Sequence, residues 1–153
     1  MVGQGPDPDQ ITAYDATYQV AGAQCSSTFE GRHVNIIESL LVHPAHADGL
    51  VDHGDPILAG WSLVGVALKS AEAAGDIMPI DTEGIWYLMV AAEWANINIG
   101  DMLFIDATTA VVSDDWEDVP FGHALAPVVF EATTLIAVKV HAFQILWPWW
   151  LFP

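Results

Sequence analysis

A chain of 153 residues can form one domain with a buried core and is short for two. Its hydrophobic fraction of 53% excludes a disordered chain, because so much apolar surface offsets the entropy lost on ordering. Its 20 acidic residues face three cations, Arg32, Lys69 and Lys139, and the formal net charge of -17 disfavours nucleic acid and anionic membranes as partners. The same acid excess would also suit a high-salt environment.

The N-terminal residues 1–30 predict an extended arm. Residues 1–10 combine glycine, proline and aspartate without an apolar period. Further along, the aromatic residues of the arm, among them Tyr14 and Tyr18, are too widely spaced to indicate a helix or a strand. No basic segment precedes an apolar stretch here, so we expect no secretory signal.

Residues 31–142 predict a mostly β domain. The run 35–42 fits either a strand or a helix, and the segment after it, rich in glycine, proline and aspartate, predicts a loop. The strands expected after this loop are 57–68 with a bend at its glycines, 76–81, 84–91, 102–105, 110–112, 121–127 and 134–142. Pro79 predicts an edge strand, and the pair Gly100-Asp101 predicts a hairpin or tight corner. Such short strands at roughly ten-residue spacing indicate a small barrel or a sandwich.

The C-terminal residues 143–153 predict an aromatic tail. The apolar run is too short to span a bilayer, and Pro148 interrupts it. Chain termini seldom belong to a core and tryptophan is favoured at interfaces, so we expect the tail to bind a neighbouring subunit or a larger scaffold. The alternative is that it packs on its own domain. The other tryptophans considered, Trp61, Trp86 and Trp94, are predicted to pack within the β domain.

One loop carries residue types that bind metals, namely His43, His46, His53, Asp48, Asp52 and Asp55. Their spacing matches no metal motif, so we interpret them as a polar loop. The acidic residues that flank Trp116 lack the ligand spacing and central glycine of a calcium loop. The single cysteine, Cys25, has no nucleophile motif around it. We therefore predict no catalytic residue, no cofactor and no metal, and no enzyme activity.

The order of several segments between residues 43 and 141 resembles a known family. These segments are HPAHADGLVDHGDPILAG, GVAL, DTEGIWYLMV, IGDMLFID, VPFGHALAPV and LIAVKV. Together they resemble the head-decoration, or capsid cement, proteins of tailed bacterial viruses, the family of the phage lambda decoration protein. The resemblance implies a β-tulip fold, assembly as a homotrimer on the outer capsid surface, and clamping of neighbouring capsomers. It carries over no catalytic residue.

The sequence is therefore interpreted as a capsid decoration protein of a virion. Its expected partners are further copies of itself and the major capsid protein. The predicted subunit or capsid contacts lie in the arm and the tail, at Tyr14, Tyr18, Trp147, Trp149, Trp150 and Phe152. Two alternatives remain: a ligand- or carbohydrate-binding β module whose aromatic residues line a concave site, and a metal-dependent hydrolase at the histidine loop.

Overall fold

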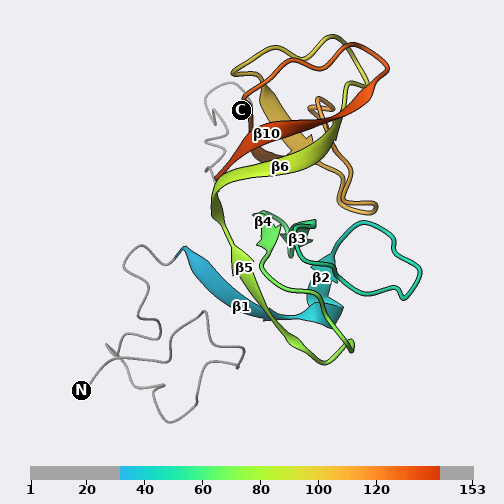
Figure 1. Ribbon diagram of the computed structural model, residues 1–153, viewed down its shortest axis with the longest axis vertical. Helices are drawn as coiled ribbons and strands as arrows, with labels where there is room; N and C mark the ends of the chain where they lie inside the picture. Colours follow the sequence, from blue (N-terminus) through green and yellow to red (C-terminus); the bar gives the residue numbers. More distant parts are fainter. Residues whose placement is uncertain (1–31, 142–153) are drawn as a thin grey trace, which may run out of the picture.

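A computed structural model describes residues 32–141 of the chain. In this range the chain forms a five-stranded sheet followed by a closed five-stranded barrel (Figure 1). The elements are β1 His33–Ile37, the short 3₁₀ helix η2 Glu38–Leu40, β2 Leu41–Val42, β3 Pro56–Ala59, β4 Leu63–Ala67, β5 Ile77–Asp81, β6 Glu83–Ala91, β7 Met102–Ile105, β8 Val112–Ser113, β9 Val119–Ala124 and β10 Thr133–His141. This confirms the prediction of a mostly β fold with a small barrel.

The first sheet is antiparallel throughout, in the order β1-β5-β4-β3-β2. Strands β4 and β5 approach each other closely at Gly65. A Cβ atom built there would lie 2.5 Å from the carbonyl oxygen of Asp81 and 2.6 Å from Cγ2 of Ile80. Glycine is therefore required at this position by the distance between the strands and not by a turn.

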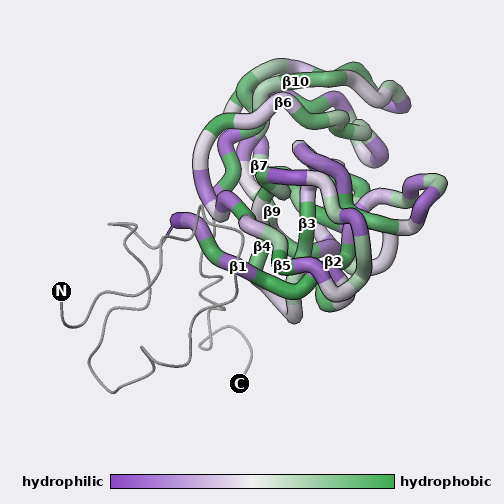
Figure 2. Tube along the Cα trace, turned by 60° about the horizontal axis from the view of Figure 1, so that its bottom comes forward, coloured by the Kyte–Doolittle hydropathy of each residue, from purple (hydrophilic) through white to green (hydrophobic). Residues whose placement is uncertain are grey.

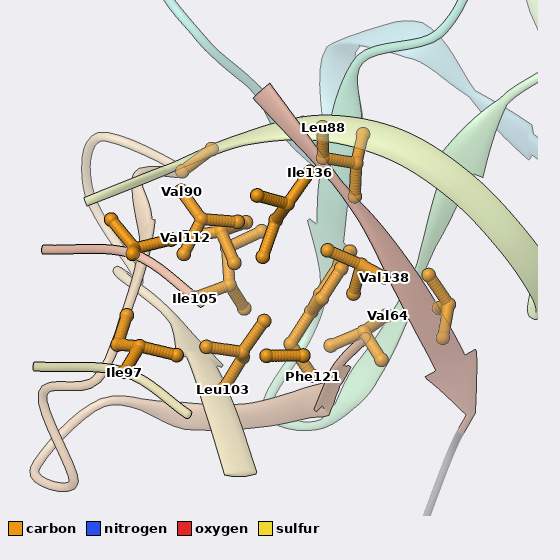
Figure 3. Packing of buried hydrophobic residues seen from close by; sticks show 14 of the residues in the cluster. Val64, Leu88, Val90, Ile97, Leu103, Ile105, Val112, Phe121, Ile136 and Val138 are labelled. Carbon is orange, nitrogen blue, oxygen red and sulfur yellow. The ribbon is translucent and has the colours of Figure 1, made fainter. Parts of the chain in front are cut away.

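The barrel has the order β10-β6-β8-β7-β9 and closes where β9 pairs with β10. Its longest ladder joins β6 to β10 over nine antiparallel pairs, from Thr133 opposite Ala91 to His141 opposite Glu83. Alternate residues of both strands point inward, because side chains alternate across a strand. Leu88 and Val90 of β6 thereby meet Ile136 of β10 inside the barrel (Figure 3).

The sheet and the barrel share one hydrophobic core. Leu58, Val64 and Val66 come from β3 and β4 of the sheet, yet they belong to the same buried cluster as Phe121 and the other barrel side chains (Figure 3). A second cluster involves other residues of the sheet and the loop beside it, and includes Val51. One set of sheet residues therefore packs into the barrel core while another set is covered by the chain's own loops.

Several expected elements differ in the structure. The single bent strand expected over 57–68 is the β3–β4 hairpin, because Gly60 turns the chain with a φ of 62°. The edge position predicted from Pro79 is wrong, since β5 lies between β1 and β4. The β4 ladder reaches only Ile80 and Asp81, and Pro79 accepts a hydrogen bond from the Leu68 N–H through its carbonyl. The missing N–H of proline therefore interrupts no pair with β4.

Other corrections concern the barrel loops. Of the hairpin or tight corner expected around Gly100, the tight corner forms: Gly100 has a φ of 90° and the Asp101 N–H donates to the Asn98 carbonyl at 3.1 Å. The hairpin does not form, because Ile97 bridges Val128 on a later loop. The run 35–42, which fitted either a strand or a helix, is β1, the 3₁₀ helix and β2 in succession. Strands expected at 110–112 and 121–127 lie at 112–113 and 119–124. Among residues 32–141, no helix is long and apolar enough to cross a membrane.

Candidate interaction surfaces

The contact residues predicted from the sequence all lie outside residues 32–141, in the predicted arm (1–30) and the aromatic tail (143–153). Their roles and the boundaries of these two segments stay predictions. The described part of the chain presents two further apolar surfaces and one histidine-rich loop, none of which was predicted to be a contact surface.

The first surface, called the loop tip, consists of the exposed side chains of Trp94, Ile99, Trp116, Val129 and Phe130 on the loops around the barrel end. The rings of Trp94 and Trp116 meet edge to face, with centroids 6.2 Å apart, and are 53% and 65% exposed. The prediction that Trp94 packs inside the domain is therefore wrong, as is that for Trp61, which is 96% exposed on the β3–β4 turn. Trp86 does pack against the barrel core.

Hydrogen bonds hold the loops of the loop tip together. The carboxylate of Asp114 accepts the backbone N–H groups of Glu93, Trp94 and Ala95 at 2.7, 3.2 and 3.0 Å. The side chain of Asn96 accepts the N–H of Phe130 at 2.8 Å. These hydrogen bonds join three loops that are far apart in sequence, so the fold holds Trp94 beside Trp116.

The segment of the chain that carries the loop tip is acidic. Residues 92–132 contain eight Asp and Glu residues and no Lys or Arg. Burial, followed by the neighbouring carboxylates of Asp115, Asp106 and others, raises the pKa of Asp118 to about 6. Carboxylates are crowded enough here to hinder each other's ionisation, so a cationic partner would be attracted.

The second surface, called the β6–β10 groove, lies on the outside of the barrel. It has a volume of about 440 Å³ and is lined by residues 44, 54–56, 87–89, 91, 109–112, 133 and 135. Outward positions of an antiparallel strand are usually polar, yet Ile85, Tyr87 and Met89 of β6 point outward and are more than half exposed. Leu135 of β10 lies directly opposite Met89. Figure 2 shows β6 and β10 side by side, with hydrophobic positions along both strands.

A signal for this groove was present in the sequence. The run GIWYLMVA, residues 84–91, is apolar at both inward and outward positions, which is typical of a strand covered on two faces. The loop tip gave a weaker signal, namely tryptophans inside acidic loops. Neither signal shows which residues lie together, because that depends on pairing between strands distant in sequence.

The histidine loop forms a hydrogen-bonded cluster around His46. Its ring lies 2.6 Å from the buried carboxylate of Asp55 and 3.3 Å from that of Asp52. The hydrogen bond to Asp55 is the main reason that the pKa of His46 is raised, with the charges of nearby aspartates adding to it. His43 stacks on His46 and lies 3.3 Å from the buried Glu38 carboxylate.

The structure does not bring the predicted metal-ligand types together as a set. His53 is exposed, and its backbone N–H donates a hydrogen bond to the Ser70 hydroxyl. Within residues 32–141, no group of three or more His, Cys, Asp and Glu residues is arranged to hold a metal ion. The polar interactions around His46 instead join residues of the same loop, such as the Asp52 N–H and the Asp55 carboxylate. They hold Asp55 in place, and Asp55 lies in one wall of the β6–β10 groove.

The corner between β5 and β6 anchors the point where the described chain begins. Arg32 donates two hydrogen bonds to the buried Asp81 carboxylate, at 2.7 and 2.8 Å, and the Thr82 hydroxyl donates to the Arg32 carbonyl. Burial raises the pKa of Asp81, but its bonds to Arg32 and to the Glu83 N–H outweigh burial and leave the pKa below its ordinary value. Gly84 has a φ of 102°, which favours glycine, and a Cβ there would collide with the Arg32 guanidinium.

Comparison with known proteins adds a family assignment to this geometry. The family model described as phage cement protein matches residues 38–140, which include strands β2 to β5 of the sheet, but not β1, and the whole barrel except its final residue. No curated protein and no solved structure gives a match. The match covers well over half of the chain, so the chain belongs to the phage cement protein family, with a cement role on a phage capsid.

Proposed function

We propose that this cement protein binds the outer surface of the phage head as a homotrimer and bridges neighbouring capsomers through the major capsid protein, without catalysing a reaction. We also propose that the combined sheet and barrel is a form of the β-tulip fold. The family assignment supports the cement role, and the observation that carries the finer proposal is the loop tip.

The loop tip has the composition expected of a binding surface. Tryptophan is enriched among residues that contribute most to binding, and two exposed tryptophans held in contact by three loops are already ordered before binding. The eight carboxylates in residues 92–132 select a partner that offers basic groups around an apolar centre. We therefore assign the contact with the capsid protein to the loop tip.

The overall charge favours the outer side of the shell. A phage head encloses nucleic acid, and a chain with a formal net charge of -17 is repelled by packed phosphate. The mechanism is linkage: a protein that binds the assembled shell and not its separated subunits stabilises the shell by about 2.7 kcal/mol at a free concentration of about 100 times Kd.

The direct test is cosedimentation with shells that lack the protein. The variant carrying Trp94→Ser and Trp116→Ser is expected to bind at least about tenfold more weakly, since removing residues of this type from an interface centre costs about 2 kcal/mol or more. Trp61→Ser is the matched control, because Trp61 is more exposed but lies on the β3–β4 turn. Equal affinity of the double variant and the control would contradict the assignment.

The alternative of a carbohydrate-binding module needs aromatic rings around a concave site. In the described part of the chain, Tyr87 is the one aromatic residue that lines the β6–β10 groove. Glycan binding by the isolated protein, together with unchanged shell stability, would favour that alternative over the cement mechanism.

A further inference from the structure

The β6–β10 groove is an apolar surface that needs an occupant. Tyr87 and Leu135, on its barrel side, are 76% and 58% exposed. Its volume of about 440 Å³ falls in the range of roughly 300–1,000 Å³ typical of pockets that enclose a ligand. An apolar area of this kind is typical of an interface, because contact with water is unfavourable.

The groove and the loop tip differ in charge. Among the residues of 32–141 that line the groove, only Asp55 is charged, and its carboxylate is engaged by His46 and by the N–H of Asp52. The groove therefore offers nothing to a basic partner and suits an uncharged apolar segment. Residues 143–153, FQILWPWWLFP, form such a segment: they contain no charged residue and five aromatic ones.

We propose that the aromatic tail (143–153) of a second copy of this chain binds in the β6–β10 groove. This inference rests on the self-association in the proposed function and identifies the surfaces that produce it. A tail from one copy in the groove of the next is a head-to-tail contact, which closes into a ring when the rotation between copies permits.

The direction of β10 explains why the tail belongs to another copy. Leu135 lines the groove, but His141 pairs with Glu83 at the opposite end of the β6–β10 ladder, about 20 Å away at 3.3 Å per residue. The chain thus leaves the barrel far from its own groove. The first aromatic residues of the tail follow His141 directly, so they would have to reverse direction at once and cross this distance to reach the groove of their own copy.

The sequence after His141 also predicts no early reversal. Residues 142–147 contain none of the turn-forming residues Gly, Pro, Asn, Asp or Ser. A reversal at Pro148 leaves four residues up to Phe152, which span about 13 Å at most. That length does not bring the aromatic residues back to the level of Leu135, whereas a groove on a neighbouring copy has no such restriction.

The test compares self-association of full-length variants by sedimentation across a concentration series. Leu135→Asp puts a charge on the groove wall, and Trp149→Ser with Trp150→Ser removes two aromatic rings from the tail. Each is expected to weaken self-association at least about tenfold, because a buried unpaired charge or a lost aromatic anchor costs more than about 1.4 kcal/mol. Leu40→Asp is the control, since Leu40 is 66% exposed on the 3₁₀ helix and is not among the residues that line the groove.

A disulfide test locates the tail directly. In a Cys25→Ser background, a chain carrying Leu135→Cys and Leu151→Cys is expected to form covalent bonds between copies under mild oxidation. Bonds within one copy only, or none, would overturn the inference, as would unchanged self-association of both the groove and the tail variants. Shell binding that depends on Trp94 and Trp116 would then still support the proposed function, whereas a wild-type protein that is monomeric and binds no shell would refute both.

Discussion

Replacing Asp114 by alanine tests whether a single carboxylate orders the loop tip. The substitution removes the acceptor for three backbone N–H groups, those of Glu93, Trp94 and Ala95. Hydrogen bonds to a charged group contribute roughly 1.5–3 kcal/mol each when shielded, but these donors can be rehydrated in an exposed loop. Loss of a side chain that accepts backbone N–H groups at the start of a helix costs up to about 2 kcal/mol, and we adopt that value for the analogous bonds in this loop. For a folded region of this size it lowers Tm by roughly 8 °C.

The assay is thermal unfolding combined with shell binding, and the control is Glu117→Ala. That control removes the same charge from the same loop, while the Glu117 side chain accepts no hydrogen bond from any other residue in the range 32–141. We expect Asp114→Ala to lower both Tm and shell affinity, because Trp94 is no longer held beside Trp116. Equal effects of the two substitutions would show that charge and not hydrogen bonding controls the loop tip, and an unchanged Tm for Asp114→Ala would refute the reasoning.

Three further predictions concern packing and pH. Gly65→Ala should destabilise the protein by about 1–3 kcal/mol through overpacking between β4 and β5, whereas Gly75→Ala, where no atom lies within 4 Å, should change the unfolding midpoint little. Asp118→Asn should stabilise the protein by about 1 kcal/mol above pH 6, a magnitude already reduced for solvent screening, and should give no gain below about pH 4. The reason is that a carboxyl whose pKa rises on folding costs stability once it ionises. Denaturant titrations at the two pH values measure the difference in the free energy of unfolding. The raised pKa of His46 means that its bond to Asp55 contributes fully below pH 6.5 and is lost as pH rises through the folded-state pKa, so His46→Gln should flatten the dependence of Tm on pH, and equal slopes would contradict this.

Most of the family-like segments could be found from sequence because they contain a residue type that the backbone requires. Gly54, Gly84 and Gly100 have φ values of 88°, 102° and 90°, which disfavour side chains. Gly122 is needed for another reason, since a Cβ there would collide with the Lys139 carbonyl oxygen on β10. Asp81 binds Arg32 and so joins the β5–β6 corner to the start of β1. Their order therefore records the fold, even though no single segment is specific.

The predictions that failed depended on tertiary context. Trp61 and Trp94 were expected to be packed inside because tryptophan buries much surface, but the β3–β4 turn and the Asp114 bonds hold them outward. Pro79 was predicted to lie at a sheet edge because proline has no N–H to donate to a neighbouring strand. In the structure, the pairing of β4 with β5 ends before it would need an N–H at Pro79. The groove was missed because Met89 and Leu135 become neighbours only through the ladder between β6 and β10, and these strands are separated in sequence by three further strands and their loops.

The two surfaces differ in a way that suits the two contacts proposed for them. In our proposals the loop tip contacts the shell and the β6–β10 groove contacts another copy of the chain, and two surfaces of the same chemistry would compete for the same partners. Here the loop tip combines aromatic rings with carboxylates, so its attraction to a basic partner weakens as salt screens charge. The β6–β10 groove is apolar with its one lining charge already engaged, so salt does not weaken binding there and salting-out ions strengthen it. The negative charge that repels two loop tips from each other leaves the groove unaffected, and the two contacts remain distinct because charge selects one partner and apolar burial selects the other.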